Sequence, residues 1–314
     1  MNYSTAQIKE LYTTPLLTLI TQARTVHQQH FSDEIEQCQL ISVKTGGCTE
    51  DCKYCSQSIH NDSKIKLNAL LPIAELQETI INAKKRGVKR ICLGAAYRSP
   101  TSRALTTVKE YIKLIKDHGL ETCVTLGNLD STQAQELKQS GLDYYNHNID
   151  TSPEYYPQIV STHTFNDRVE TIANVAAAGI NVCCGGIMGM GESQDDRISF
   201  IKALTDLPAT PASIPINTLV KIAGTKLADV AELDKLELLR VIATLRIIFP
   251  ATRIRLAAGR SQLTELEQTV LFLAGANSIF IGEKLLTTPN NLFESDSKLL
   301  RELTQPGSNQ VNNA

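Results

Sequence analysis

Residues 90–126 read RICLGAAYRSPTSRALTTVKEYIKLIKDHGLETCVTL and hold two short β-rich runs on either side of one helical repeat. The runs cover 90–94 and 121–126, and residues 103–118 between them place apolar side chains at helical spacing. Gly119 follows the repeat, and a glycine there supplies the left-handed cap that ends a helix. A strand, a helix and a second strand in this order predict a βαβ unit with parallel strands.

The same alternation continues on both sides of this unit. The other β-rich runs are 40–45, 142–149, 180–187, 213–220, 252–257 and 277–281, and the other helical patterns are 73–86, 131–140, 166–178, 192–206, 232–248 and 262–274. Eight strands alternating with helices favour the α/β class and a closed (β/α)8 barrel of the TIM type. A doubly wound open sheet is the alternative, although no G-x-G-x-x-G motif follows an early strand.

Three segments follow from this pattern. Residues 5–30 read as one helix, so we expect an N-terminal helical extension over 1–38. The barrel is expected over 39–286. The polar residues that end the chain predict a partly disordered C-terminal tail over 287–314.

Composition narrows the class of protein. The 314 residues are 42% hydrophobic and 20% charged with a net charge of -2, which fits a soluble globular protein and gives no sign of a nucleic-acid or membrane partner. No apolar run approaches the ~18 residues that span a bilayer, and the N-terminus lacks the pattern of a signal peptide. We therefore expect a cytoplasmic protein whose eight cysteines bind metal, act in catalysis or pack in the core, rather than form disulfides.

Alternation along the strands predicts which side chains face the barrel interior. Side chains on one strand face meet the helices and those on the other meet the interior. If the apolar set faces the helices, the interior set is polar or thiol-bearing: Arg90, Cys92, Gly94, Cys123, Asn146, Asn148, Asp150, Cys183, Asn217 and Arg255. Barrel interiors are ordinarily filled by Val, Ile and Leu, and buried polar groups are costly without partners. The interior is therefore expected to enclose ligands.

A cysteine triplet follows the first strand, in Gly46–Ser56, with the spacing C-x-x-x-C-x-x-C. Three thiolates on one tight loop can reach three corners of an iron–sulfur cube and leave one iron open to a ligand. A structural zinc loop is the alternative, but such a site usually needs a fourth protein ligand, for which His60 is the nearest candidate.

The spacing C-x-x-x-C-x-aromatic-C is similar to the signature of the radical S-adenosylmethionine enzymes. This resemblance implies that Cys48, Cys52 and Cys55 hold a 4Fe–4S cluster whose fourth iron binds S-adenosylmethionine. It further implies that one electron from the cluster cleaves the sulfonium and yields a 5′-deoxyadenosyl radical.

A second group of thiols lies on the predicted interior face. Cys92, Cys123 and Cys183 come from three strands, and Arg255 lies on the strand before the last. Each cysteine alone would more often be a small core residue. Together they suit a 2Fe–2S cluster, which needs four ligands, with the arginine offsetting charge by hydrogen bonds or serving as the fourth ligand.

Stretches along nearly the whole chain resemble the biotin synthase family. They are KTGGCTEDCKYCSQS, ICLGAA, ETCVTLG, LDYYNHNIDTSPE, VCCGGIMGMGE, PINTLVKIAGTKLA, IRLAAGR and AGANSIFIGEKLLTTPN. The resemblance implies insertion of sulfur between C6 and C9 of dethiobiotin, the last step of biotin formation, with the 2Fe–2S cluster on Cys92, Cys123, Cys183 and Arg255 as the sulfur donor. It also implies an electron donor such as flavodoxin or ferredoxin, iron–sulfur assembly machinery and a homodimer.

The resemblance also implies contacts of single residues. Those expected at S-adenosylmethionine are Tyr54, Gly94, Ala95, Asn148, Asp150, Arg168 and Ile187, and those expected at the substrate are Asn146, Asn148 and Asn217. Simpler interpretations remain open, because short polar residues also serve turns and caps, and Arg168 suits a solvated helix surface. Many radical enzymes of this class carry Gly-Gly-Glu after the second strand, whereas this chain has Gly94-Ala95-Ala96.

Three further residues are expected to have structural roles rather than to bind a ligand. Cys184 follows Cys183 and has helix-facing parity, Cys38 matches no motif, and His147 has the parity opposite to Asn146 and Asn148.

Three other functions remain open. They are a different radical S-adenosylmethionine enzyme acting on another small substrate, a zinc-loop barrel aldolase using Lys44 or Lys221 at a strand end, and a non-catalytic iron–sulfur carrier.

Overall fold

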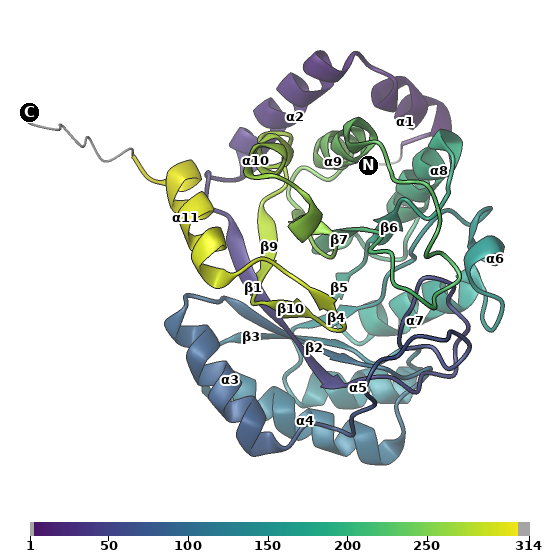
Figure 1. Cartoon of the computed structure of the whole chain (residues 1–314), viewed down its shortest axis with the longest axis vertical. Coiled ribbons are helices and arrows are strands. Elements are labelled where there is room, and N and C mark those ends of the chain that lie inside the picture. Colours follow the sequence, from purple (N-terminus) through teal and green to yellow (C-terminus); the bar gives the residue numbers. More distant parts are fainter. Residues whose placement is uncertain (1–2, 307–314) are drawn as a thin grey trace, which may run out of the picture.

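A computed structural model describes residues 3–306, and its centre is a closed barrel of parallel strands (Figure 1). The strands are β1 Glu36–Lys44, β2 Arg90–Ala95, β3 Glu121–Thr125, β4 Tyr144–Asn146, β5 Asn181–Cys183, β6 Gly186–Met188, β7 Ser213–Thr218, β8 Arg253–Leu256 and β9 Ser278–Ile281. They pair in the order β5-β4-β3-β2-β1-β9-β8-β7-β6, and a further β5–β7 pairing closes the ring. The (β/α)8 barrel is thereby confirmed, since β5 and β6 together fill one strand position.

The break between β5 and β6 corrects the single strand expected over 180–187. Cys184 and Gly185 separate the two segments. Gly185 lies so close to β7 that a Cβ there would overlap the carbonyl oxygen of Pro215. Only a glycine leaves room for such a close approach of two backbones.

The helices of the barrel follow the predicted order around the strands. They are α3 Ile73–Lys85, α4 Ser102–Asp117, α5 Ser131–Gln139, α7 Phe165–Ala177, α8 Gln194–Thr205, α9 Lys235–Ile248 and α10 Glu265–Leu273, with a short α6 Tyr156–Ile159 and a 3-10 turn η1 Arg260–Gln262. The glycine cap predicted at Gly119 is confirmed, since this residue adopts φ of 74° after α4, and Gly87 adopts φ of 78° after α3 in the same way. Asp130 caps α5 by accepting a hydrogen bond from the backbone of Gln133 at 2.8 Å.

The N-terminal extension contains two helices, α1 Thr5–Tyr12 and α2 Leu16–His30, where the sequence predicts one. Pro15 lies at the break because proline lacks an N–H and disfavours helical backbone in the residue before it. The two helices lie beside α8 and α9 (Figure 1). The end of the extension also shifts, because β1 begins at Glu36, ahead of the predicted boundary at 38.

The segment after the barrel also differs from the expected tail over 287–314. β10 Lys284–Leu285 and β11 Thr288–Pro289 form an antiparallel hairpin, and α11 Phe293–Thr304 follows. Asp296 on α11 forms a buried ion pair of 2.6 Å with Arg260. The helix is therefore part of the folded body, while residues 307–314 of the predicted tail lie outside the described residues.

The apolar core surrounds the barrel rather than filling it. Ile91, Leu93, Val124 and Ile254 face the helices, as strand alternation predicts. The interior holds a separate cluster that contains cysteines. Among the described residues, no helix has the length and apolar character needed to cross a membrane.

Candidate active site

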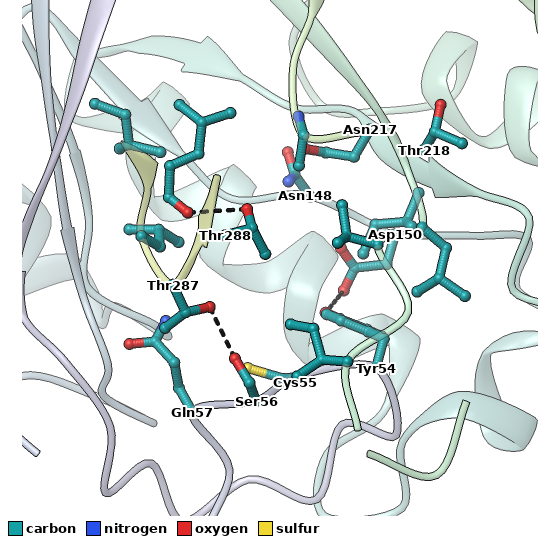
Figure 2. Close-up of a pocket in the computed structure, with 18 of the residues that line it drawn as sticks. Tyr54, Cys55, Ser56, Gln57, Asn148, Asp150, Asn217, Thr218, Thr287 and Thr288 are labelled. Carbon is teal, nitrogen blue, oxygen red and sulfur yellow. Dashed lines mark hydrogen bonds between the residues drawn. The ribbon is translucent and has the colours of Figure 1, made fainter. Parts of the chain in front are cut away.

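The candidate site lies at the carboxyl ends of the strands, the end where loops build the active sites of barrel enzymes. Two adjoining cavities open there, of about 220 and 200 Å³. They share a wall formed by Tyr54, Cys55, Gln57, Asn148, Asp150 and Leu286. Figure 2 shows the first cavity, with Asp150 and Tyr54 on one side and the hairpin residues Thr287 and Thr288 on the other.

The cysteine loop forms one wall of the second cavity. Gly46 and Gly47 have φ of 75° and 70° and let the chain turn sharply as it leaves β1. Asn61 fixes the loop by donating to the carbonyl oxygens of Cys52 and Cys55 at 3.0 and 2.8 Å. All three cysteines of the C-x-x-x-C-x-x-C motif line this cavity, so the loop brings them together as the sequence predicts.

The free thiols of this loop are protonated in the absence of iron. Burial raises the pKa of Cys52, and it raises the pKa of Cys55 to about 11. Burial also raises the pKa of Cys48. Iron binds the thiolate form, so loading a cluster here must release protons.

A chain of hydrogen bonds connects the loop to the segment after β4 and to α7. Tyr54 donates from its hydroxyl to Asp150 at 2.8 Å, and Arg168 Nη2 donates to the same carboxylate oxygen at 3.2 Å. Arg168 Nε also donates to the hydroxyl of Tyr156 at 2.8 Å, and that hydroxyl interacts with His163 Nε2 at 2.8 Å. Glu50 completes the chain at 2.6 Å from His163 Nδ1. Arg168 therefore lies in a buried network facing the cavity, and the interpretation as a solvated helix charge is wrong.

The other residues expected at S-adenosylmethionine lie along the same two cavities. Ala95 lines the second cavity, Ile187 lines the first, and Asn148 lines both. Gly94 is the exception, since neither cavity includes it and a Cβ there would meet Leu286 Cδ2 at 2.5 Å. A glycine at this position therefore leaves room for the hairpin.

The residues expected at the substrate connect the cavities to the barrel interior. Asn217 lines the first cavity and bridges two strands, donating to the carbonyl of Gly186 at 3.1 Å and accepting from the amide of Ala258 at 3.1 Å. Asn146 points inward and donates to Cys183 Sγ at 3.3 Å. His147 is buried against Tyr145 as expected, yet it also borders the second cavity.

The predicted interior thiols meet inside the barrel. Cys92, Cys123 and Cys183 pack in one buried cluster with Ala257, Phe280 and Leu285. A hydrogen bond from Cys123 lowers the pKa of Cys183 to about 6, against the opposing effect of burial. Cys184 faces the helices, as expected from its parity. The alternation of side chains along separate strands thus predicts a real three-thiol cluster.

Arg255 is fully buried beside these thiols. Its Nε donates to Ser278 Oγ at 2.9 Å, and its Nη2 donates to Glu36 Oε2 at 3.0 Å. Burial alone would raise the pKa of Glu36, but the charges of Arg255 and Arg90 hold that pKa at about 2. A buried carboxylate therefore fixes the orientation of the guanidinium.

Unpartnered polar atoms surround the interior thiols. Arg255 Nη1, Arg90 Nη1 and Ser213 Oγ are buried and have no hydrogen-bond partner within the described part of the chain. Native proteins leave few buried donors unsatisfied. Two guanidinium donors beside three thiols suit a ligand that binds thiolates and accepts hydrogen bonds, and the sulfides of a 2Fe–2S cluster do both.

Sequence reasoning misses several residues of this region, above all Cys38. Its thiol is buried in the same cluster as the three predicted thiols and lies 3.0 Å from Arg255 Nη2. The strand expected over 40–45 starts too late to include it, although the alternation of Glu36, Cys38 and Leu40 gives the signal once β1 is known to begin at Glu36. The hairpin wall with Leu286 and Thr287 lies within the family-like stretch 274–290, although no contact was expected from either residue.

The aldolase interpretation gains no support from its lysines. Lys44 Nζ donates to the carbonyls of Gly46 and Ala96, both at 2.7 Å, which holds the amine away from the cavities. Lys221 lies 3.8 Å from Glu232 and lines neither cavity. Over residues 3–306, no three His, Cys, Asp or Glu side chains converge closely enough to hold a single metal ion.

A barrel with a three-cysteine loop at its mouth defines the class of radical S-adenosylmethionine enzymes. The family model of the radical SAM superfamily matches residues 42–204, and the model of the Biotin and Thiamin Synthesis associated domain matches residues 215–304. Enzymes of this superfamily use S-adenosylmethionine and a 4Fe–4S cluster.

Two similar proteins identify the family within this superfamily. The chain is 53% identical over 300 residues to a biotin synthase of Francisella tularensis subsp. tularensis, covering 95% of this chain and 96% of that protein. It is 52% identical over 300 residues to a biotin synthase of Francisella philomiragia, with the same coverage. The chain therefore belongs to the biotin synthase family and is an enzyme.

Solved structures agree on the fold. The crystal structure of a methylornithine synthase superposes with a TM-score of 0.82 at 19% identity and covers 98% of this chain and 95% of that chain. At this identity the likeness concerns the barrel architecture and not the reaction.

Proposed function

We propose that this enzyme inserts sulfur between C6 and C9 of dethiobiotin to form biotin. One observation carries the proposal: four predicted interior residues, Cys92, Cys123, Cys183 and Arg255, converge beneath the cavities that the cysteine loop borders. A radical enzyme with a single cluster has no need of a second thiol group inside its barrel. The family membership supports the same reaction.

The residues divide between two clusters. Cys48, Cys52 and Cys55 would hold the 4Fe–4S cluster, and Cys92, Cys123 and Cys183 would hold the 2Fe–2S cluster, with Arg255 beside its fourth corner. When bound, these clusters and S-adenosylmethionine supply a radical that removes hydrogen from unactivated C–H bonds and the sulfur that replaces it. Side-chain acids and bases cannot attack such bonds, so the cofactors carry the chemistry and the barrel encloses it.

The protein's own groups bind and orient the small molecules. Arg168 presents a guanidinium to the second cavity and suits the carboxylate of S-adenosylmethionine. Asp150 and Asn148 border both cavities. Either can accept a hydrogen bond from a ribose hydroxyl or a ureido group, and Asn148 can also donate one. The shared wall would hold S-adenosylmethionine and dethiobiotin next to each other, as direct hydrogen transfer requires.

The enclosure has a second function. Leu40, Ile187, Phe280 and Leu285 contribute apolar surface to the first cavity. Such walls suit an aliphatic chain like that of dethiobiotin, and they offer no hydrogen-bonding groups that would hold water near a radical.

The test is anaerobic reconstitution with iron and sulfide, followed by addition of dethiobiotin, S-adenosylmethionine and a reductant such as reduced flavodoxin. Biotin and 5′-deoxyadenosine should both form. The variant Cys123→Ala should make neither a 2Fe–2S signal nor biotin, whereas Cys184→Ala, which alters a helix-facing thiol, should behave as the unaltered enzyme. Formation of 5′-deoxyadenosine without biotin would indicate a different substrate, and zinc without visible absorbance would overturn the assignment of both clusters.

A further inference from the structure

The guanidinium of Arg168 is held along one edge and is free along the other. Its Nε donates to the hydroxyl of Tyr156 at 2.8 Å, and its Nη2 donates to Asp150 Oδ2 at 3.2 Å. Neither contact uses Nη1, and the residue lines the cavity of about 200 Å³. A guanidinium has five N–H donors, so these two contacts leave three for a ligand.

The contact with Tyr156 sets the direction of the hydrogen bonds behind it. A guanidinium can only donate, so the oxygen of Tyr156 accepts from Arg168, and its single hydrogen is available to His163 Nε2 at 2.8 Å. Because Nε2 is then the acceptor of the ring, Nδ1 carries the hydrogen and donates it to Glu50 Oε2 at 2.6 Å. Burial and the charge of Arg168 lower the pKa of His163, which agrees with a neutral ring. Both ring nitrogens are therefore occupied within the protein.

Glu50 fixes the far end of this chain of hydrogen bonds. Its carboxylate is buried, accepts a hydrogen bond from the hydroxyl of Thr162 and lies 3.3 Å from Arg98 Nε. A carboxylate that accepts the Nδ1 hydrogen selects one tautomer of a histidine and orients its ring. The cysteine loop, which carries Glu50, thus determines that His163 offers Tyr156 an acceptor and not a donor.

Packing makes this support rigid. Tyr156 is 1% exposed, and its ring meets those of His163 and Phe165 edge to face, with centroids 5.9 and 5.6 Å apart. In such a closely packed group no ring can turn without moving its neighbours. The hydroxyl of Tyr156 is therefore fixed before any ligand arrives, and a ligand of Arg168 is spared the cost of ordering that side chain.

We propose that Glu50 and His163 are positioning residues for S-adenosylmethionine. They act through Tyr156, whose hydroxyl turns the free edge of Arg168 towards the carboxylate of the ligand. Neither touches that carboxylate, since His163 has no ring nitrogen left for it and Glu50 is itself an anion. This inference rests on the proposed function in one respect, because it takes Arg168 as the partner of the carboxylate.

The test is a double-mutant cycle on the affinity for S-adenosylmethionine, measured by equilibrium dialysis with the full chain loaded with iron and sulfide. His163→Leu should weaken the Kd about 5- to 10-fold, as expected for residues coupled through one hydrogen-bond network. In the Arg168→Gln background the same change should alter the Kd less than about 2-fold, because the residue through which it acts is gone. An equal loss in both backgrounds would overturn the proposal.

A second ligand separates positioning from damage to the fold. The probe 5′-methylthioadenosine has the nucleoside of S-adenosylmethionine but no carboxylate, so His163→Leu should leave its Kd unchanged. Equal weakening of both ligands would contradict a role through Arg168. Tyr156→Phe removes only the hydroxyl and should repeat the pattern of His163→Leu with both ligands.

His118→Leu is the matched control, because that ring bonds instead to the carbonyl of Leu114 on α4, at 2.8 Å. It should bind both ligands as the unaltered protein does. Circular dichroism and the absorbance of the 4Fe–4S cluster report whether each variant folds.

The outcomes separate this inference from the proposed function. Biotin formation by the unaltered enzyme, together with additive effects of His163→Leu and Arg168→Gln, would overturn the positioning role and leave the proposed function standing. Formation of 5′-deoxyadenosine without biotin, together with the expected cycle, would overturn the proposed substrate and support the positioning role. A Kd that Arg168→Gln leaves unchanged would overturn the positioning role whatever the reaction.

Discussion

Any side chain at Gly185 would destabilise the barrel, because this residue lies against the neighbouring strand β7. Its Cα lies against the backbone of Pro215 on β7, and its carbonyl accepts the amides of Ile149 and Asp150 at 3.1 and 3.3 Å. We expect Gly185→Ala to destabilise the protein by more than 3 kcal/mol, because the added carbon overlaps backbone that cannot move away. Urea denaturation followed by circular dichroism measures this loss.

The control is Gly87→Ala, at a glycine with φ of 78° and no atom within 4 Å of the added Cβ. A non-glycine residue with this backbone costs only about 1 kcal/mol. Equal losses for the two variants would show that conformation, and not close packing, sets the requirement for Gly185.

Arg168 is the residue whose replacement should separate ligand binding from folding. We expect Arg168→Gln to weaken binding of S-adenosylmethionine about 10- to 100-fold, the range for losing hydrogen bonds to a charged group. Equilibrium dialysis with the loaded enzyme measures the Kd. Glu170→Gln, at an exposed position of the same helix α7, should leave the Kd unchanged. A normal Kd for Arg168→Gln would place the carboxylate of the ligand elsewhere.

At the scale of elements, the attachment of α11 depends on one buried ion pair. Arg260 and Asp296 form two bonds of 2.6 and 2.7 Å, and both side chains are 1% exposed. Removing one partner leaves a buried charge, so Asp296→Ala should destabilise the protein by about 3–5 kcal/mol. The exposed pair of Arg24 and Asp33 is the control, and Asp33→Ala should cost less than about 1 kcal/mol. Limited proteolysis should show cleavage within α11 only in the first variant.

The helix α2 should respond to acid through its buried residue His27, whose ring packs against Phe31. Burial, aided by the charge of Arg246, lowers the pKa of His27. Below pH 6.5 the unfolded chain therefore binds a proton that the folded protein does not, and stability falls as the pH falls. We expect the Tm to drop more between pH 7 and pH 5.5 in the unaltered protein than in His27→Gln, as thermal unfolding followed by circular dichroism would measure.

The exposed His30 on the same helix provides the comparison for this pH effect. His30→Gln should follow the unaltered protein over the whole pH range. A parallel pH profile for His27→Gln and the unaltered protein would show that His27 titrates equally in the folded and unfolded states.

Elements were more predictable from sequence than their ends. Alternation between apolar strands and helices predicts the barrel, because each βαβ unit repeats a local pattern. The ends depend on contacts that no local pattern records: β1 extends back to Glu36 because that carboxylate pairs with Arg255, 219 residues away. By contrast, the apolar residues of α11 do recur at helical spacing, and what the sequence could not reveal is the contact of its Asp296 with Arg260.

The candidate site was also predictable only in part from the sequence. Parity predicts that Cys92, Cys123 and Cys183 share the interior, and the packing confirms it. The motif predicts the cysteine loop. The hydrogen-bonded chain from Glu50 through His163 to Arg168 was not predictable, because it joins residues that are distant in sequence and polar residues carry no periodic signal of their partners.

At the scale of the whole molecule, the two segments matched by separate family models are not separate domains. The barrel closes through the pairings β1–β9, β6–β7 and β5–β7, all of which join the first segment to the second. We expect fragments 1–209 and 210–314, expressed apart, to show no cooperative unfolding, since each would expose unpaired strand edges. Mixing the fragments during refolding should restore a cooperative transition.

Cleavage after folding gives the control for the fragment experiment. A protease site inserted in the loop at residue 209, between α8 and β7, should be cut without loss of the folded barrel. Cooperative unfolding of the isolated fragment 1–209 would show that the first segment is a domain by itself.

The hairpin β10–β11 follows the last barrel strand and covers the cavity that the early cysteine loop borders. During translation, the three cysteines of that loop leave the ribosome more than two hundred residues before Leu286 and Thr287. A nascent chain can thus expose its thiols to oxygen and stray metal ions long before the roof of the site exists. Delivery of iron and sulfide to the cysteine loop is consequently suited to the released chain, and removal of residues 285–314 would leave that loop without the hairpin that covers it.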